Sequence, residues 1–360
     1  MMEEIAAHKD SSTVLTDIPR YTMQPTQPEW ALSSAHIPAT NLLLFFLTIL
    51  TTTTAGAYMA GEDLSILHPI AAVVSLRAGL SFSMPLMAIL LAHEMGHYLT
   101  ARYHGVPTSL PYFIPAPPIF ITGTLGAFIR IKAMPRTRRV MFDIGAAGPW
   151  AGVVVAIPAV IVGLWLSTIS PIDKSSGGLE LGNSLLFLGL SRMVLGVDPA
   201  AVTVTLHPLA FAGWFGLFVT SINLLPVGQL DGGHVTYALF PRLHRTISTL
   251  FVVSCVLMVI VPLALGWELW WGWLLWAVLA IGLGLGHPAT VDRDTPLNPR
   301  RALAAWLSVA LFIVTFSPVP LSLVQPEPTQ MQEPRGHTQE ILDPTAPHSR
   351  MPRHDWGVRI

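Results

Sequence analysis

The sequence predicts a polytopic α-helical membrane protein with about seven transmembrane helices, in a range of about six to eight. A short membrane-associated β-hairpin or sheet is predicted between the second and third of them. Hydrophobic residues make up 52% of the chain and charged residues only 11%, and the mean hydropathy is +0.56. A soluble domain carries roughly a quarter charged residues. The net charge of −1 gives no indication of nucleic-acid binding.

Apolar stretches of membrane-spanning length recur along the chain. We predict spans at 41–60, 78–103, 143–168, 202–225, 246–265, 269–285 and 302–316. A further apolar piece at 184–195 is too short to count as a span. The polar ends are predicted to be a cytoplasmic N-terminal tail, 1–40, and a flexible C-terminal tail, 326–360, on either side of a single membrane domain, 41–325.

Between the second and third spans the pattern changes from helical to extended. Prolines such as Pro111 and Pro115 are incompatible with a helix interior. Residues 124–131, bounded by Gly123 and Pro135, have the composition of a strand. An exposed sheet edge binds an extended peptide by adding it as another strand. An ordinary solvent-exposed hairpin explains the pattern equally well, so both interpretations stay open here.

The second predicted span carries the motif His93-Glu94-Met95-Gly96-His97. Histidines four residues apart project from one face of a helix, so both imidazoles can bind one zinc ion. Glu94 then lies where it can accept a proton from a water molecule at the metal. The alternative is a pair of core histidines held by hydrogen bonds, but ionisable groups are costly in an apolar span and usually functional.

A catalytic zinc ion usually has three protein ligands. The soluble pattern HExxHxxGxxH fails here, because the later positions hold Thr100 and Tyr103. A single cysteine, Cys255, excludes a cysteine-based zinc site. Two aspartates near span ends are candidates. Asp231 precedes two glycines that permit close backbone approach, but it also suits a turn or cap. Asp143 is better explained as a helix N-cap.

The loop charges predict the orientation of the site. Lys and Arg concentrate in the N-terminal tail and in the loops after the second, fourth and sixth spans, while the opposite loops hold only Arg77, Lys174 and Arg192. The positive-inside rule places the basic side in the cytoplasm. The motif histidines and Asp231 both lie toward that side.

These residues resemble the site-2 protease family of intramembrane zinc metalloproteases, in its chloroplast-like and bacterial branch. The resemblance is carried by His93-Glu94-Met95-Gly96-His97 on a membrane helix, together with Asn223-x-x-Pro226 and Leu230-Asp231-Gly232 at the end of a later one. It extends over residues 41–325. It implies that this region is an intramembrane metalloprotease domain with one Zn²⁺ per chain.

The resemblance also implies roles for particular residues. His93, His97 and Asp231 match the family's zinc ligands, and Glu94 matches its catalytic acid and base. Asn223 matches a residue that engages the substrate backbone or the developing oxyanion. The edge strand against which substrate lies corresponds to Gly126, Ala127, Phe128 and Ile129. For His234, directly after the aspartate motif, we expect a capping or supporting role.

The implied function is hydrolysis of peptide bonds within or near transmembrane segments of membrane proteins. The expected partners are such a substrate and the lipid bilayer, with no nucleic acid. A membrane metal transporter or sensor that uses His93, His97 and Asp231 is the alternative. The first 40 residues lack an Arg-rich transit pattern, which favours the bacterial cell membrane over an organelle.

Overall fold

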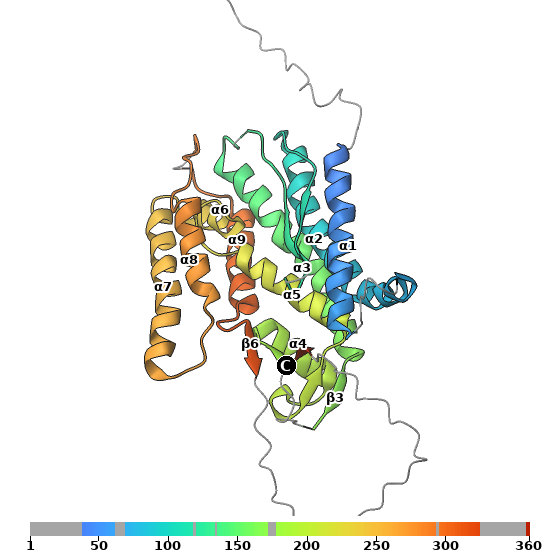
Figure 1. Ribbon diagram of the computed structural model, residues 1–360. Coiled ribbons are helices and arrows are strands. Elements are labelled where there is room, and N and C mark those ends of the chain that lie inside the picture. The colour runs from blue at the N-terminus through green and yellow to red at the C-terminus, as the bar shows by residue number, and fades with distance from the viewer. Residues whose placement is uncertain are drawn as a thin grey trace, which may run out of the picture. The chain divides into compact units, whose positions relative to one another are not determined.

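The computed structural model describes residues 38–61, 69–117, 120–133, 135–171, 178–292, 295–324 and 358–360. The predicted N-terminal and C-terminal tails, 1–40 and 326–360, lie almost entirely outside these ranges. The described part is mostly helical and contains two small sheets (Figure 1).

Nine α-helices lie within the described ranges. Their bounds are α1 (Ala39–Met59), α2 (Pro69–Tyr103), α3 (Arg138–Trp165), α4 (Leu185–Leu195), α5 (Pro208–Asn223), α6 (Asp231–Leu239), α7 (His244–Leu265), α8 (Gly272–Leu283) and α9 (Pro299–Thr315).

Four of these helices are long and apolar enough to cross a membrane: α1, α2 from Leu76 onward, α3 and α7. They correspond to four of the predicted spans, namely 41–60, 78–103, 143–168 and 246–265. The helices at the other three predicted spans are shorter, with 16 residues in α5, 12 in α8 and 17 in α9. The total of about seven crossings therefore stays a prediction.

The predicted span 202–225 is wrong as a single helix. Thr203–Thr205 forms strand β5 instead, and α5 begins only at Pro208, with the His207 side chain accepting a hydrogen bond from the Leu209 N–H. The three residues of this strand, Thr203, Val204 and Thr205, are all β-branched and favour extended backbone. Proline is well suited to the first turn of a helix. A hydropathy window averages over both features, which is why it merged the strand with the helix.

The prediction that Asp143 caps a helix is also wrong. Helix α3 begins at Arg138, and the side chain of Thr137 accepts the hydrogen bond from the Val140 N–H. Asp143 therefore lies inside the helix, more than a turn after its start. A threonine side chain can cap a helix as well as an aspartate side chain does. The prediction placed the helix start at Asp143, where the sequence changes from polar to apolar, and this is too late because the first turn of α3 itself begins with polar residues.

The first sheet pairs β1 (Tyr112–Pro115) with β2 (Thr124–Phe128) in antiparallel orientation. The register shifts between Phe113↔Ala127 and Pro115↔Thr124, so β2 has one extra residue there. Gly126 lies in this irregularity with a φ of 99°, a conformation that favours glycine. The sheet is tied to α1 by a hydrogen bond of 2.8 Å from Asn41 Nδ2 to the Pro111 carbonyl.

The second sheet did not follow from the sequence patterns. Its order is β3-β5-β7-β4-β6, and its strands are β3 (Thr168–Ser170), β4 (Gly178–Leu181), β5 (Thr203–Thr205), β6 (Leu321–Val324) and β7 (Val358–Arg359). Each strand has four residues or fewer. Periodicity is not readable over such lengths, and the pairing depends on contacts between distant segments.

Helix α3 packs against α2, α5 and α6. Small residues allow the helices to approach closely. A Cβ atom added at Gly96 of α2 would lie 2.5 Å from the carbonyl oxygen of Ala147 in α3. One added at Gly163 of α3 would lie 2.1 Å from the Ala210 nitrogen in α5. This packing sets the histidine motif of α2 directly against α3.

Candidate metal centre

Three side chains from two helices converge in the interior. His93 and His97 project from α2, and Asp231 is the first residue of α6. The Nε2 atoms of His93 and His97 lie 3.2 Å apart. Asp231 Oδ2 lies 3.3 Å from His93 Nε2 and 3.2 Å from His97 Nε2. Both histidines are buried. The structure thus brings together residues that are more than 130 positions apart in the sequence.

The donor atoms fit a zinc ion in type and in spacing. Zinc binds imidazole nitrogen and carboxylate oxygen at about 2.0–2.2 Å with tetrahedral angles, so its ligand atoms lie about 3.3 Å from one another. The three observed separations match this value. Among the described residues, His93, His97 and Asp231 are the group whose ligand atoms converge in this way.

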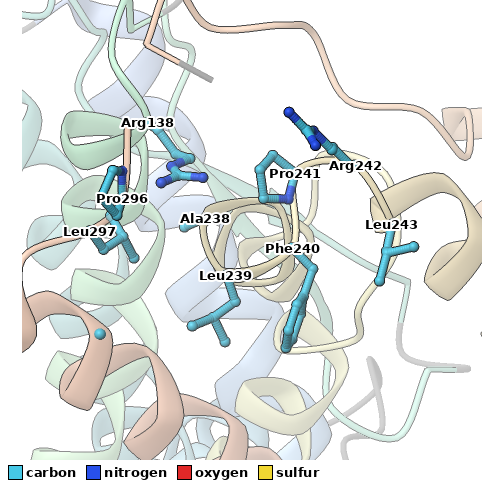
Figure 2. Close-up of a pocket in the computed structure, with 10 residues that line it drawn as sticks. Arg138, Ala238, Leu239, Phe240, Pro241, Arg242, Leu243, Pro296 and Leu297 are labelled. Atoms are coloured by element: carbon cyan, nitrogen blue, oxygen red, sulfur yellow. The ribbon is translucent and has the colours of Figure 1, made fainter. Parts of the chain in front are cut away.

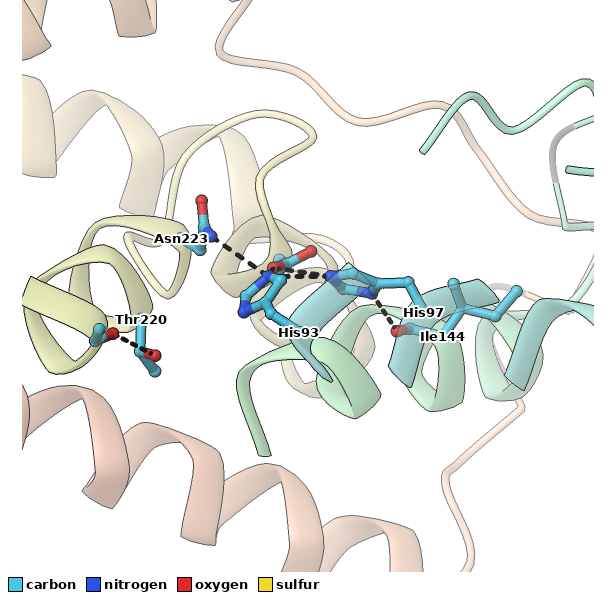
Figure 3. Close-up of polar contacts among 7 residues, drawn as sticks. His93, His97, Ile144, Thr220 and Asn223 are labelled. Atoms are coloured by element: carbon cyan, nitrogen blue, oxygen red, sulfur yellow. Dashed lines mark hydrogen bonds and ion pairs between the residues drawn. The ribbon is translucent and has the colours of Figure 1, made fainter. Parts of the chain in front are cut away.

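A backbone carbonyl orients His97. Its Nδ1 donates a hydrogen bond of 2.7 Å to the carbonyl oxygen of Ile144 in α3, as Figure 3 shows. The proton therefore resides on Nδ1, and Nε2 presents its lone pair toward the other two ligand atoms. Metal-binding histidines are commonly fixed by a contact of this kind.

Asp231 is placed by the glycines that follow it. A Cβ atom added at Gly232 would lie 1.9 Å from the Leu224 carbonyl oxygen, and one added at Gly233 would lie 2.4 Å from that of Gly228. The first turn of α6 therefore packs directly on the backbone of the preceding loop. Asp231 Oδ2 faces the Nε2 atoms of His93 and His97 at 3.3 and 3.2 Å, so the carboxylate can bind a cation together with the two imidazoles.

Asp143 lies beside the centre in an ion-pair cluster. Its carboxylate accepts hydrogen bonds of 2.8 and 2.7 Å from the Arg301 guanidinium, and His104 Nε2 lies 3.0 Å from Oδ2. The cluster joins the C-terminal end of α2 to α3 and α9. The next residue, Ile144, carries the carbonyl that orients His97. Asp143 therefore pairs with Arg301 and His104 and does not contribute a donor atom to the group of three.

Glu94 and Asn223 border the three ligands. Glu94 is buried, with 6% of its surface exposed, and its carboxylate interacts with the backbone of Ile129. Asn223, the last residue of α5, places Nδ2 3.2 Å from His93 Nε2 (Figure 3). A carboxyl group and an amide group are thus available close to the three candidate metal ligands.

Strand β2 ends at the centre. It contains Gly126, Ala127 and Phe128, and Ile129 follows it directly. Among the described strands, β2 pairs only with β1. Two of its large apolar side chains are exposed, Leu125 at 59% and Phe128 at 47%. The second edge of β2 is therefore not covered by any strand in the described part of the chain.

Two cavities border α6 without reaching the metal ligands. One of about 750 Å³ lies at the C-terminal end of α6, lined by residues that include Arg138, Phe240 and Arg242 (Figure 2). The other, of about 310 Å³, lies between α6 and α9 and is lined in part by Gly232 and Trp306. Neither lining includes the two histidines or Asp231.

Within the described ranges, a mostly helical fold with four helices of membrane-spanning length and the His93, His97 and Asp231 group is typical of membrane-embedded metalloproteins. The model of the family described as Peptidase family M50 matches residues 81–266, a range that contains all three ligands. The chain therefore belongs to peptidase family M50.

Curated relatives are named as zinc metalloproteases. The chain is 37% identical over 217 residues to the probable zinc metalloprotease EGY1, chloroplastic, of Arabidopsis thaliana, which covers 58% of this chain and 38% of that protein. It is 29% identical over 251 residues to the probable zinc metalloprotease EGY2, chloroplastic, of Oryza sativa subsp. indica. That alignment covers 68% of this chain and 43% of the relative. The chain thus spans about two fifths of the length of these relatives. No solved structure matches it.

The sequence patterns gave no particular role to several groups that lie around the centre. The Ile144 carbonyl belongs to the backbone and leaves no signal in side-chain identity. Gly148 of α3 faces the ring of His97, since a Cβ atom added there would lie 2.0 Å from Nε2. His287 contacts His234 from a segment more than 50 residues away. Only the run of small residues in α3 gave any indication of close packing.

Proposed function

We propose that this chain is an intramembrane zinc metalloprotease that hydrolyses peptide bonds within or near transmembrane segments of membrane proteins. The observation that carries the proposal is the triangle of His93, His97 and Asp231 donor atoms with Glu94 beside it, in a chain of peptidase family M50. The membrane domain is proposed to comprise residues 41–325.

In the proposed mechanism, the three ligands hold one zinc ion. When bound, zinc supplies Lewis-acid chemistry, because it polarises a carbonyl and lowers the pKa of water. Glu94 accepts a proton from the attacking water and returns it to the leaving amide nitrogen. Asn223 donates from its amide to the substrate carbonyl, where negative charge develops. The Ile144 carbonyl keeps His97 in the tautomer that binds the metal.

The uncovered edge of β2 is proposed to hold the substrate. The carbonyls of a transmembrane helix are engaged in its own hydrogen bonds, so a substrate must unwind locally before attack. An extended segment gains backbone hydrogen bonds by pairing with a strand edge. Leu125 and Phe128 offer apolar contacts, and the position of Ile129 beside Glu94 sets the paired segment next to the catalytic carboxylate.

The membrane and the orientation also remain our proposals. We propose about seven membrane crossings, with the hairpin of β1 and β2 associated with the membrane and the metal centre toward the basic, cytoplasmic side. The bacterial cell membrane stays our prediction, although the relatives above are named as chloroplastic.

Removal of the metal tests the proposal. The purified chain is reconstituted into liposomes with a model single-span substrate, and cleavage is followed by gel electrophoresis and mass spectrometry. We expect a chelator to abolish cleavage and added zinc to restore it, because zinc supplies the Lewis acid. The same liposomes, loaded with a fluorescent zinc indicator, report uptake. Zinc uptake without cleavage would overturn the protease proposal in favour of a metal transporter.

The substitution Gly126→Ala tests the proposed substrate strand. With a φ of 99°, alanine at this position is strained and shifts the local path of β2. We expect KM for a model substrate to rise several-fold with a smaller change in kcat, since the metal ligands are untouched. Gly196→Ala is the matched control, because Gly196 also has a positive φ, 68°, and open space around it but caps α4. An equal rise of KM in both variants would remove the support for strand pairing.

A further inference from the structure

A group of side chains behind α6 joins this helix to the segment between α8 and α9. We call His234, Tyr237, His287 and Thr290 the histidine clamp. His234 Nδ1 lies 2.8 Å from His287 Nε2, and the Tyr237 ring stacks on that of His287 at a centroid distance of 4.2 Å and an angle of 16°. The Tyr237 hydroxyl accepts a hydrogen bond of 3.1 Å from the Thr290 N–H. Two residues of α6 are thus bound to one distant segment.

The hydrogen bonds of the clamp have one consistent direction. His287 Nδ1 lies 2.9 Å from the carbonyl oxygen of Pro288, which can only accept, so Nδ1 carries the proton. Nε2 of the neutral ring is then an acceptor, and His234 Nδ1–H donates to it. Burial and the neighbouring His287 lower the pKa of His234 to about 4, and burial lowers the pKa of His287. Both rings are therefore neutral near neutral pH.

Helix α6 depends on such contacts for its position. It has only nine residues, and its N-cap residue, Leu230, makes no side-chain hydrogen bond. Isolated helices shorter than about 12 residues are marginal in water. His234 lies one turn after Asp231 and packs on α3, where a Cβ atom added at Gly145 would lie 2.7 Å from His234 Cβ. His234 is therefore held between α3 and His287.

We propose that His287 is a positioning residue for the third metal ligand. Through its hydrogen bond to His234 and its stacking on Tyr237, it fixes α6 so that the Asp231 carboxylate stays beside His93 and His97. This inference rests on the proposed function, because it concerns the same metal centre. A displacement of α6 by a fraction of an ångström changes the 3.2–3.3 Å separations that suit zinc.

The test measures zinc affinity by chelator competition on the full chain in detergent. His287→Phe keeps an aromatic ring for stacking on Tyr237 but removes the acceptor for His234. We expect zinc to bind about tenfold to a hundredfold more weakly, the range typical for loss of a group that orients a metal ligand. We also expect the visible absorption bands of the cobalt-substituted protein to shift. His287→Gln offers an acceptor again and should recover part of the affinity.

His244→Phe is the matched control. His244 is 2% exposed and its ring meets that of His287 edge-on at 5.4 Å, but its polar interactions are with the backbone of Gly228 and Gly233 and not with His234 or His287. We expect this variant to keep the parent affinity and cobalt spectrum. Equal affinities in the parent, His287→Phe and His244→Phe would overturn the inference alone. A parent chain that binds no zinc would overturn the proposed function itself.

Discussion

Replacement of Glu94 by glutamine is expected to abolish cleavage while zinc stays bound. Glutamine has nearly the shape of glutamate, so the packing around this buried side chain is retained, but it cannot accept a proton from water. General acid-base catalysis contributes about 10²–10⁴-fold to a rate, so we expect kcat to fall by at least about 10²-fold. The measurement is kcat for a model membrane substrate, with the zinc content determined by mass spectrometry.

Glu180→Gln is the control for Glu94→Gln. Glu180 is an exposed residue of β4 and is not part of the metal centre. The same chemical change there should leave cleavage unaffected. If Glu94→Gln keeps its zinc but loses cleavage, Glu94 acts in proton transfer and is not needed for metal binding. Undiminished cleavage by Glu94→Gln would exclude Glu94 as the proton acceptor, and loss of zinc from that variant would indicate that Glu94 supports the metal instead.

The local part of the site could be predicted from the sequence, and the distant part depended on the fold. His93 and His97 lie on one face because of helix geometry alone, and the structure places their Nε2 atoms 3.2 Å apart. The sequence motifs around Asp231 identified this residue as a third candidate, but its position depends on how α6 packs on the loop before it. The sequence favours a helix-cap role for Asp143 over a metal-ligand role, whereas the structure places Asp143 inside α3, where it pairs with Arg301 and His104.

Hydropathy predicted the long helices better than the short elements. The window that identified α1, α3 and α7 responds to composition over about twenty residues, so it joined β5 to α5 and extended α8 beyond its 12 residues. The five-stranded sheet has strands of two to four residues, and its pairing of β4 with β7 joins residues far apart in the chain. Such long-range pairing leaves no periodic signal in either segment.

Replacement of Gly148 by alanine is expected to displace His97 and weaken zinc binding. The added Cβ atom would lie 2.0 Å from His97 Nε2 and 2.5 Å from Cε1, closer than any non-bonded contact permits. Helix α3 cannot move away freely, because it packs against α2, α5 and α6 and overpacked interiors cost about 1–3 kcal/mol. The imidazole must therefore turn, which also strains its hydrogen bond to Ile144. We expect zinc affinity, measured by chelator competition, to fall by about tenfold to a hundredfold.

Two further glycines give Gly148→Ala a graded control. A Cβ atom at Gly152, one turn further along α3, would lie 3.3 Å from His93 Cβ, and one at Gly189 of α4 would meet nothing within 4 Å. Because alanine favours the helix over glycine by about 0.8–1.0 kcal/mol, Gly189→Ala should be neutral or slightly stabilising. We therefore expect zinc affinity to fall most in Gly148→Ala, less in Gly152→Ala and not in Gly189→Ala. If all three variants bound zinc as the parent does, His97 could not be a ligand in this geometry, because its Nε2 and the new methyl group would have to occupy the same space.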